Sequence, residues 1–279
     1  MTEMNEQKTN NLTPKEMIIK AEGIGIDKAQ LSSLKLLLLG LLAGAYIAFG
    51  AVFSEVAVTG MAGIWPYGIT RILAGVTFSL GLILVVVGGA ELFTGNNLMI
   101  IALLNRNISF FSMLRNWLLV YIGNFIGSIL VALLVIGSHM YTFANGELGN
   151  TMLTNAVNKT HSTFLQAITL GILCNILVCL AIWLTYSTQN TGAKILAIIF
   201  PISAFVAAGF EHSVANMFIL PVGLFLKSID SAFVAGLNLN LSSLTWGNFL
   251  IGNLLPVTIG NILGGSIFVG LVYYLIYHD

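Results

Sequence analysis

Charged residues are so rare in this sequence, and so unevenly placed, that the apolar stretches between them decide the type of fold. The windows between consecutive ionisable residues are 36–54, 72–90, 116–138, 162–193, 195–210, 213–226 and 231–277. A helix that crosses the hydrocarbon core of a membrane needs about 20 apolar residues. The first four windows are long enough alone, whereas 195–210 and 213–226 are separated only by Glu211 and His212 and join as one interrupted span. The last window yields a span over roughly residues 249–276, which makes six spans.

The composition agrees with a protein embedded in lipid. Of the 279 residues, 57% are hydrophobic and 8% are charged, whereas soluble domains carry about a quarter charged residues. The 11 basic and 11 acidic residues cancel, which removes the basic face that a nucleic-acid partner requires. We therefore predict an all-α integral membrane protein whose channel domain covers residues 34–277.

The basic residues between the spans predict the orientation of the chain. With six spans, both termini lie on one side, and that side holds Lys8, Lys15, Lys20, Lys28, Lys35, Arg106, Arg115 and Lys194. The opposite side holds Arg71, Lys159 and Lys227. Basic loops stay on the cytoplasmic side, so we expect a multi-pass protein of the cell (inner or plasma) membrane with cytoplasmic termini. Residues 1–33 are too polar for a signal peptide and form a cytoplasmic segment, in which 15–31 are compatible with a helix on the membrane surface.

The two halves of the sequence resemble each other. Residues 89–97 read GAELFTGNN and residues 209–217 read GFEHSVANM, with Gly, Glu and Asn in register at an offset of 120. A Gly-Asn-x-x-Gly pattern begins at Gly123 and again at Gly260, and more weakly Gly40 and Gly44 match Gly171 and Asn175. The repeats, about 34–138 and 163–277, hold three spans each, so they enter the membrane in opposite directions. Inverted repeats of this kind place a transport site between broken helices near the midplane, here the second and fifth.

Glu91, Glu211 and His212 are the ionisable residues that we expect at depth, where a charge costs several kcal/mol. The two carboxylates suit the support of backbone N–H groups freed at a helix break, with direct contact to a substrate as the alternative. Asn96 and Asn216 suit capping of the half-helix that follows each break. His212 is either a packing residue or a functional one, since imidazole titrates near physiological pH and can give a proton to a weak-acid anion.

The residues around the breaks favour a small anion or polar solute. Half-helices that start at the midplane direct their positive ends inward, and we find no free acid pair for a metal ion and no sign of a cofactor. Thr94 places a hydroxyl at the first break, where Leu92 and Phe93 suit a dry constriction. For four further apolar candidates ordinary packing is the default, namely Phe78, Leu82, Val178 and Phe205. Lys159 either keeps a loop solvated or concentrates anions at an entrance.

These stretches resemble the formate–nitrite transporter family, and within it the formate channels. The resemblance is carried by residues 89–96, 171–175, 209–217 and 256–261, and its finer part by residues 78–84 and 218–221. It implies an aquaporin-like protomer of six helices, five of which form a homopentamer with one pore each. It also implies a central His212 facing Thr94, an entrance Lys159 and a span-four Asn175. The constrictions of the family map onto Phe78, Leu82, Leu92, Phe93, Val178 and Phe205.

The function predicted is therefore a channel or transporter for formate and related small monovalent anions, and not an enzyme. Lys159 would gather the anion, His212 would donate a proton at the constriction and Thr94 would orient the carboxyl oxygen. Nitrite and hydrosulfide suit the same chemistry and remain alternatives. A neutral-solute channel of the aquaporin type is less favoured, because the Asn-Pro-Ala pair of that family lacks its Pro here. The sequence also has no His-Glu-x-x-His, membrane Asp pair or Ser–Lys dyad of an intramembrane hydrolase.

Overall fold

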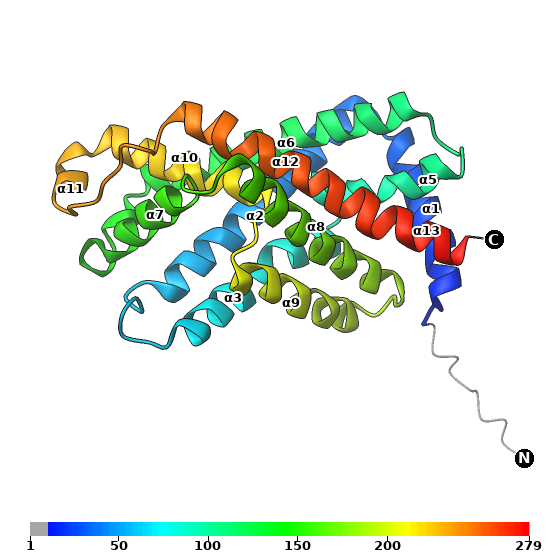
Figure 1. Ribbon diagram of the computed structural model, residues 1–279, viewed down its shortest axis with the longest axis horizontal. Coiled ribbons are helices and arrows are strands. Elements are labelled where there is room, and N and C mark those ends of the chain that lie inside the picture. Colours follow the sequence, from blue (N-terminus) through cyan, green and yellow to red (C-terminus); the bar gives the residue numbers. More distant parts are fainter. Residues whose placement is uncertain (1–10, 279) are drawn as a thin grey trace, which may run out of the picture.

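The computed structural model describes residues 11–278, and the chain there folds into a bundle of long apolar helices (Figure 1). Within these residues six helical segments are long and apolar enough to cross a membrane. They are α2 (Ser33–Val58), α3 (Tyr67–Gly88), α6 (Phe110–Gly137), α8 (Phe164–Tyr186), α9 (Thr191–Ala208) and Asn248–Tyr277, the last built from η4 (Asn248–Leu254), α12 (Leu255–Ile262), η5 (Leu263–Leu271) and α13 (Val272–Tyr277). The prediction of an all-α protein with six spans is confirmed.

Two of these spans are continued by a shorter helix after a break. Helix α3 is capped by Gly89 (φ 76°) and α9 by Gly209 (φ 78°), both in a left-handed conformation that glycine adopts without strain. Three residues without regular structure follow each glycine. The chain then resumes as α4 (Phe93–Asn96), η1 (Asn97–Met99) and α5 (Ile100–Leu104) after the first break, and as α10 (Ser213–Ile229) after the second. The second and fifth crossings are therefore broken where the sequence predicted.

The inverted repeat is also visible in how the unbroken spans pack. Helix α2 crosses α6 in the first half, and α8 crosses α12 in the second. A Cβ atom at Gly40 would lie 2.9 Å from the carbonyl oxygen of Val120, and one at Gly171 would lie 2.8 Å from that of Val257. Such contacts allow only glycine, and membrane helices use small residues to bring their backbones this close. The repeated glycines are thus the crossing points of two equivalent helix pairs.

The remaining helices cover the two ends of the bundle. Helix α1 (Pro14–Gln30) packs beside α5 and α13 at one end, and buries Met17, Ile18 and Ala21. Helix α7 (Glu147–Asn158) lies at the other end with η2 (Met140–Thr142), η3 (Ala144–Gly146) and α11 (Ser231–Ala235), as Figure 1 shows. We refer to these as the α1 end and the α7 end. The membrane-surface position predicted for residues 15–31 stays a prediction.

Candidate functional site: the paired helix breaks

The two breaks meet through one hydrogen bond between side chains. Thr94, in the first turn after the first break, and His212, the last residue of the second break, lie with Oγ1 and Nε2 2.9 Å apart. Both side chains are buried, with exposed fractions of 0% and 2%. The structure therefore brings together two residues that lie 118 positions apart in the sequence. Helices α4 and α10, which belong to opposite halves of the repeat, contact each other there.

The hydrogen bonds of His212 indicate where its proton lies. The backbone N–H of Ala215 donates to Nδ1 at 3.1 Å, so His212 is the N-cap of α10. A nitrogen that accepts a hydrogen bond carries no proton, so the ring hydrogen is assigned to Nε2, which donates to the Thr94 oxygen. The hydroxyl hydrogen of Thr94 is then left to be donated to another group. The pair thus offers a hydrogen-bond donor at the meeting point of the breaks.

A network of charged and amide side chains supports the first break from the α1 end. Lys28 Nζ lies 2.7 Å from Glu91 Oε2 and donates to Asn96 Oδ1 at 2.7 Å. The amide of Asn96 donates to Glu91 Oε2 at 2.7 Å and to Asn116 Oδ1 at 2.8 Å. Asn116 closes the ring by donating to the backbone carbonyl of Lys28 at 3.1 Å. Helix α1 is therefore attached to the break through Lys28.

The second break has a corresponding network, supported from the α7 end, except that Asn216 Oδ1 has no partner among the described residues. Lys159 Nζ lies 2.7 Å from Glu211 Oε1. The amide of Asn216 donates to Glu211 Oε2 at 2.6 Å and to Asn253 Oδ1 at 2.7 Å. Asn253 donates to the backbone carbonyl of Lys159 at 2.9 Å. Each lysine, carboxylate and asparagine thus has its counterpart in the other half of the chain.

The backbone N–H groups freed at the breaks have other partners than the sequence suggested. We expected Glu91 and Glu211 to satisfy them and Asn96 and Asn216 to act as caps, but these side chains bind one another and the lysines. Two further asparagines instead accept a hydrogen bond from one freed N–H group at each break. Their side-chain oxygens accept from the N–H groups of Phe93 and Ser213, each at 2.9 Å, and belong to Asn124 and Asn261.

Asn124 and Asn261 also link each break to the nearby helix crossing through hydrogen bonds. Asn124 donates to the carbonyl oxygens of Gly40 at 2.7 Å and Glu91 at 3.0 Å. Asn261 donates to those of Gly171 at 2.8 Å and Glu211 at 2.9 Å. Both asparagines are fully buried, and buried polar groups require such partners. The same hydrogen bonds occur in both halves of the chain, which explains why Gly and Asn recur together in the sequence.

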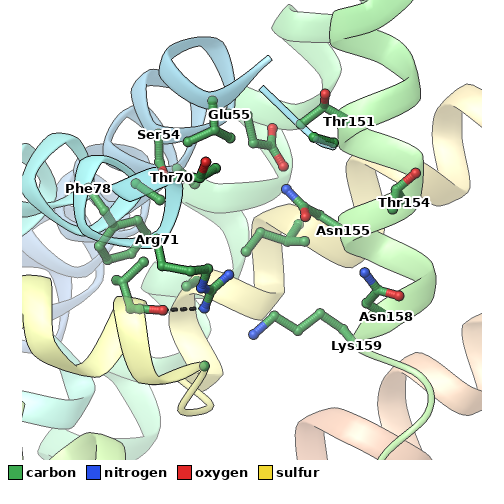
Figure 2. A pocket seen from close by; sticks show the side chains of 18 of the residues that line it. Ser54, Glu55, Thr70, Arg71, Phe78, Thr151, Thr154, Asn155, Asn158 and Lys159 are labelled. Atoms are coloured by element: carbon green, nitrogen blue, oxygen red, sulfur yellow. Dashed lines mark hydrogen bonds between the residues drawn. The ribbon is translucent and has the colours of Figure 1, made fainter. Parts of the chain in front are cut away.

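A cavity of about 800 Å³ opens from the α7 end toward His212, and we call it the vestibule. Lys159, Glu211 and His212 line it, and Figure 2 shows Lys159 directed into it from the end of α7. Phe78 and Phe205 line its inner part, with ring centroids 5.7 Å apart in an edge-to-face contact. The Phe205 ring lies 5.9 Å from that of His212. The vestibule therefore has an apolar wall beside the Thr94–His212 pair.

The other predicted lining residues lie deeper in the protein than the vestibule. Leu82, Leu92, Phe93 and Val178 are buried in the apolar core, and Phe93 packs edge-on against Tyr121 with centroids 4.8 Å apart. These four residues are absent from the vestibule wall. Their part in a constriction stays a prediction.

Asn175 joins the first break to the last span. Its amide donates to the carbonyl oxygen of Thr94 at 3.2 Å, to Asn97 Oδ1 at 2.8 Å and to the carbonyl oxygen of Asn261 at 2.7 Å. The Asn175 side-chain oxygen has no hydrogen-bond partner among the described residues. The side chain is thus close to Thr94, and its contact with a substrate stays a prediction.

Sequence reasoning missed several residues of the site. Lys28, Asn116 and Asn253 were not singled out, although Lys28 and Lys159 are 131 residues apart, the same offset as Gly40 and Gly171. That shared offset was the available signal. Glu55 was also missed, because the first apolar stretch between charges ends at residue 54, whereas helix α2 continues to Val58. It is a further buried ionisable residue within a span, which corrects the expectation of only three.

Comparison with known proteins agrees with this architecture. The model of the family described as formate/nitrite transporter matches residues 15–275. The formate channel FocA of Escherichia coli (strain K12) is 43% identical over 270 residues, covering 95% of this chain and 94% of the relative. The formate channel FocA of Haemophilus influenzae is 40% identical over 264 residues, covering 93% of each chain.

Solved structures show the same likeness. A pentameric formate channel with formate bound superposes with a TM-score of 0.80 at 41% identity, covering 88% of this chain and 98% of that one. An ion channel of the FNT family superposes with a TM-score of 0.78 at 31% identity, covering 94% and 98%. The match over nearly the whole chain, with the duplicated breaks, shows that this protein belongs to the formate/nitrite transporter family.

Proposed function

We propose that the protein is a membrane channel for formate and related small monovalent anions, assembled as a homopentamer with one pore in each protomer. The observation that carries the proposal is the Thr94–His212 pair, which joins the two helix breaks at the inner end of a vestibule that bears Lys159. Support comes from relatives named as formate channels and from a pentameric neighbour with formate bound. Transport, with no chemical conversion of the solute, is the activity proposed.

The path starts where Lys159 enters the vestibule. Its positive charge attracts an anion, and the salt bridge to Glu211 limits how tightly that anion is held. Phe78 and Phe205 then present an apolar wall that excludes hydrated ions. An anion that has shed water meets the Thr94 hydroxyl, whose hydrogen is free to be donated because His212 supplies the other hydrogen bond.

Proton transfer from His212 is the second part of the proposal. The ring can give up a proton and stay neutral only after it has gained a second proton at Nδ1. That nitrogen now accepts the Ala215 N–H, so the gain breaks the cap of α10, at a cost of about 1 kcal/mol. We therefore expect proton delivery to be coupled to movement of the first turn of α10.

The proposed orientation places the α7 end outside the cell and both termini in the cytoplasm. Lys15, Lys20 and Lys28 of α1 then lie on the cytoplasmic side, as the excess of basic residues there requires. Nitrite and hydrosulfide are the alternative substrates, because both are small monovalent anions of weak acids. The membrane proposed is the inner (cell) membrane.

Flux measurements in proteoliposomes test the proposal. Uptake of formate, nitrite and hydrosulfide is compared at two pH values for the wild type and for His212→Asn, which can still cap α10 but does not titrate. At saturating anion concentration, preferred formate uptake that rises at low pH, and loses that rise in His212→Asn, is the expected result. Equal uptake of all three anions would overturn the preference for formate. Undiminished formate flux in a His212→Phe variant would overturn the protonation step.

A further inference from the structure

Glu55 is a buried carboxyl group in the vestibule wall that the proposed transport path does not use. It lies in the last turn of α2, is 3% exposed and lines the same cavity as Lys159 and His212. Neither of its oxygens has a hydrogen-bond partner of normal geometry among residues 11–278. The negative end of a helix is the least favourable place for a carboxylate, so capping of α2 does not explain the residue.

The two cationic side chains of the vestibule, Arg71 and Lys159, bind groups other than Glu55. Arg71 donates to the carbonyl oxygens of Ala207, at 3.1 Å, and Val206, as Figure 2 shows for one of these bonds. Lys159 binds Glu211. The ionisable residues that line the cavity with Glu55 are Arg71, Glu147, Lys159, Glu211 and His212. None of them forms a salt bridge with Glu55 among the described residues.

The wall opposite Glu55 is a polar stripe of α7. Thr151, Thr154, Asn155 and Asn158 line the vestibule at helical spacing, and the Asn155 amide faces the Glu55 carboxyl group in Figure 2. Helices α2 and α7 also meet through the hydroxyl groups of Thr59 and Thr151, 3.5 Å apart. The seam between the two helices thus holds a carboxyl group without a hydrogen bond of normal geometry, and an amide that faces it.

The partner that this seam accepts must bring a hydrogen-bond donor. A metal cation fits poorly, because no cluster of three acidic, cysteine or histidine ligands occurs in the described part of the chain and two cations already line the cavity. A carboxylate repels Glu55 when both are ionised, but two carboxyl groups bind well when they share one proton. The amide N–H of Asn155 can donate to the second oxygen of the same solute.

We propose that Glu55 and Asn155 form a binding subsite in the vestibule for a monocarboxylate together with one proton, which is shared between the solute and the Glu55 carboxyl group. The inference rests on the proposed function, since it concerns how an anion of that class is collected. The proton comes from the solution at the α7 end and leaves with the solute or returns there. The subsite therefore favours anions of weak carboxylic acids over anions that do not accept a proton, such as chloride.

The test compares Glu55→Gln with a matched control, Glu147→Gln, which removes a carboxylate from an exposed position of the same wall. The KM for formate uptake is measured in proteoliposomes at about pH 5.5 and about pH 7.5. Between the lower and the higher pH, we expect the KM of the wild type and of Glu147→Gln to rise about fivefold or more. The KM of Glu55→Gln should rise less than about twofold over the same range. Asn155→Ala should weaken uptake at the lower pH but keep the pH dependence.

A binding measurement separates failure of the subsite from failure of the proposed function. Thermal stabilisation by formate, against chloride at equal ionic strength, is recorded in detergent for each variant at both pH values. Stabilisation at low pH that requires Glu55, without formate flux, would refute the channel and support the subsite. Normal flux with a Glu55→Gln pH profile like that of the wild type would overturn the subsite. The same profile change in Glu147→Gln would also overturn it, since general vestibule charge would then be the cause.

Discussion

The duplicated Lys–Glu pairs allow the energetic equivalence of the two breaks to be measured. In the first half, Lys28→Met and Glu91→Gln are made singly and together. In the second half, Lys159→Met and Glu211→Gln are made in the same way. Each set is a double-mutant cycle, which isolates the energy of the pair from the effects of the single substitutions.

The structure sets the size of the expected effect. The lysine side chains are both 21% exposed, and the glutamate side chains are 10% and 6% exposed. Removal of one partner from a buried pair costs about 3–5 kcal/mol, because the other charge stays unpaired. One-fifth exposure of each lysine lets water solvate part of that charge, so we expect about 2–3 kcal/mol for each single variant. The double variants leave no unpaired charge and should cost no more than one single variant, which gives a coupling of about 2 kcal/mol.

Thermal unfolding in detergent is the assay. A loss of 1 kcal/mol shifts the midpoint of a protein of this size by about 2–4 °C, so single variants should melt about 5–10 °C below the wild type. Conservation of the helical far-ultraviolet signal is the control that each variant folds. The two cycles should agree closely, since the Lys–Glu distance is 2.7 Å in both, although Lys28 also donates to Asn96 Oδ1 and Asn216 Oδ1 has no partner among the described residues.

Two results would refute this reasoning. Additive single effects in either cycle would show that the pair contributes no coupling, and that the hydrogen bonds to Asn96 or Asn216 alone hold the carboxylate. A coupling in the Lys159 cycle that exceeds the Lys28 cycle by more than about 1 kcal/mol would show that the halves match in geometry but not in energy.

Two further predictions follow from the same network and from the helix crossings. Asn124→Leu leaves the buried N–H of Phe93 without its acceptor, and Asn261→Leu does the same for Ser213. Each substitution should lower the free energy of unfolding by about 2–3 kcal/mol. Equal stability of Asn261→Leu and the wild type in thermal melts would contradict the capping role. Gly44→Val places a side chain against the backbone of Asn124 and should lower the free energy of unfolding by about 3 kcal/mol or more. Gly137→Val is the control, because a Cβ atom there has open space. The control should melt within about 3 °C of the wild type.

The fold could be predicted from the sequence because lipid imposes simple requirements. Spans must be long and apolar, and ionisable residues within them need a reason, so the windows between charges located all six crossings. Glycine followed by Glu in both halves located the breaks, because few residues other than glycine end a helix at positive φ. The boundaries were less accurate, and Glu55 was placed outside a span that in fact includes it.

The partners within the site could not be predicted, for a physical reason. The sequence shows that a carboxylate lies at each break. Several side chains could donate a hydrogen bond to it, and which of them does so depends on the helix that packs nearby. Helix α1 brings Lys28 to Glu91 from a segment that looked like a polar N-terminal tail. Asn124 and Asn261 had been noticed only as repeat markers, although their side chains take the capping role that we had assigned to Asn96 and Asn216.

The hydrogen bonds already formed at the breaks have a consequence for transport. The N–H groups of Phe93, Ser213 and Ala215 already donate to protein atoms, so the half-helix ends supply an electrostatic field but do not offer these donors to a solute. Donors near the breaks that have no acceptor among the described residues include the Thr94 hydroxyl, the Ser213 hydroxyl and the Asn97 amide. A solute held only by a few neutral hydrogen bonds is bound weakly, and conduction requires binding weak enough to permit release. We therefore expect selection to occur where the solute still has water and protons to exchange, which is the vestibule lined by Lys159 and Glu55.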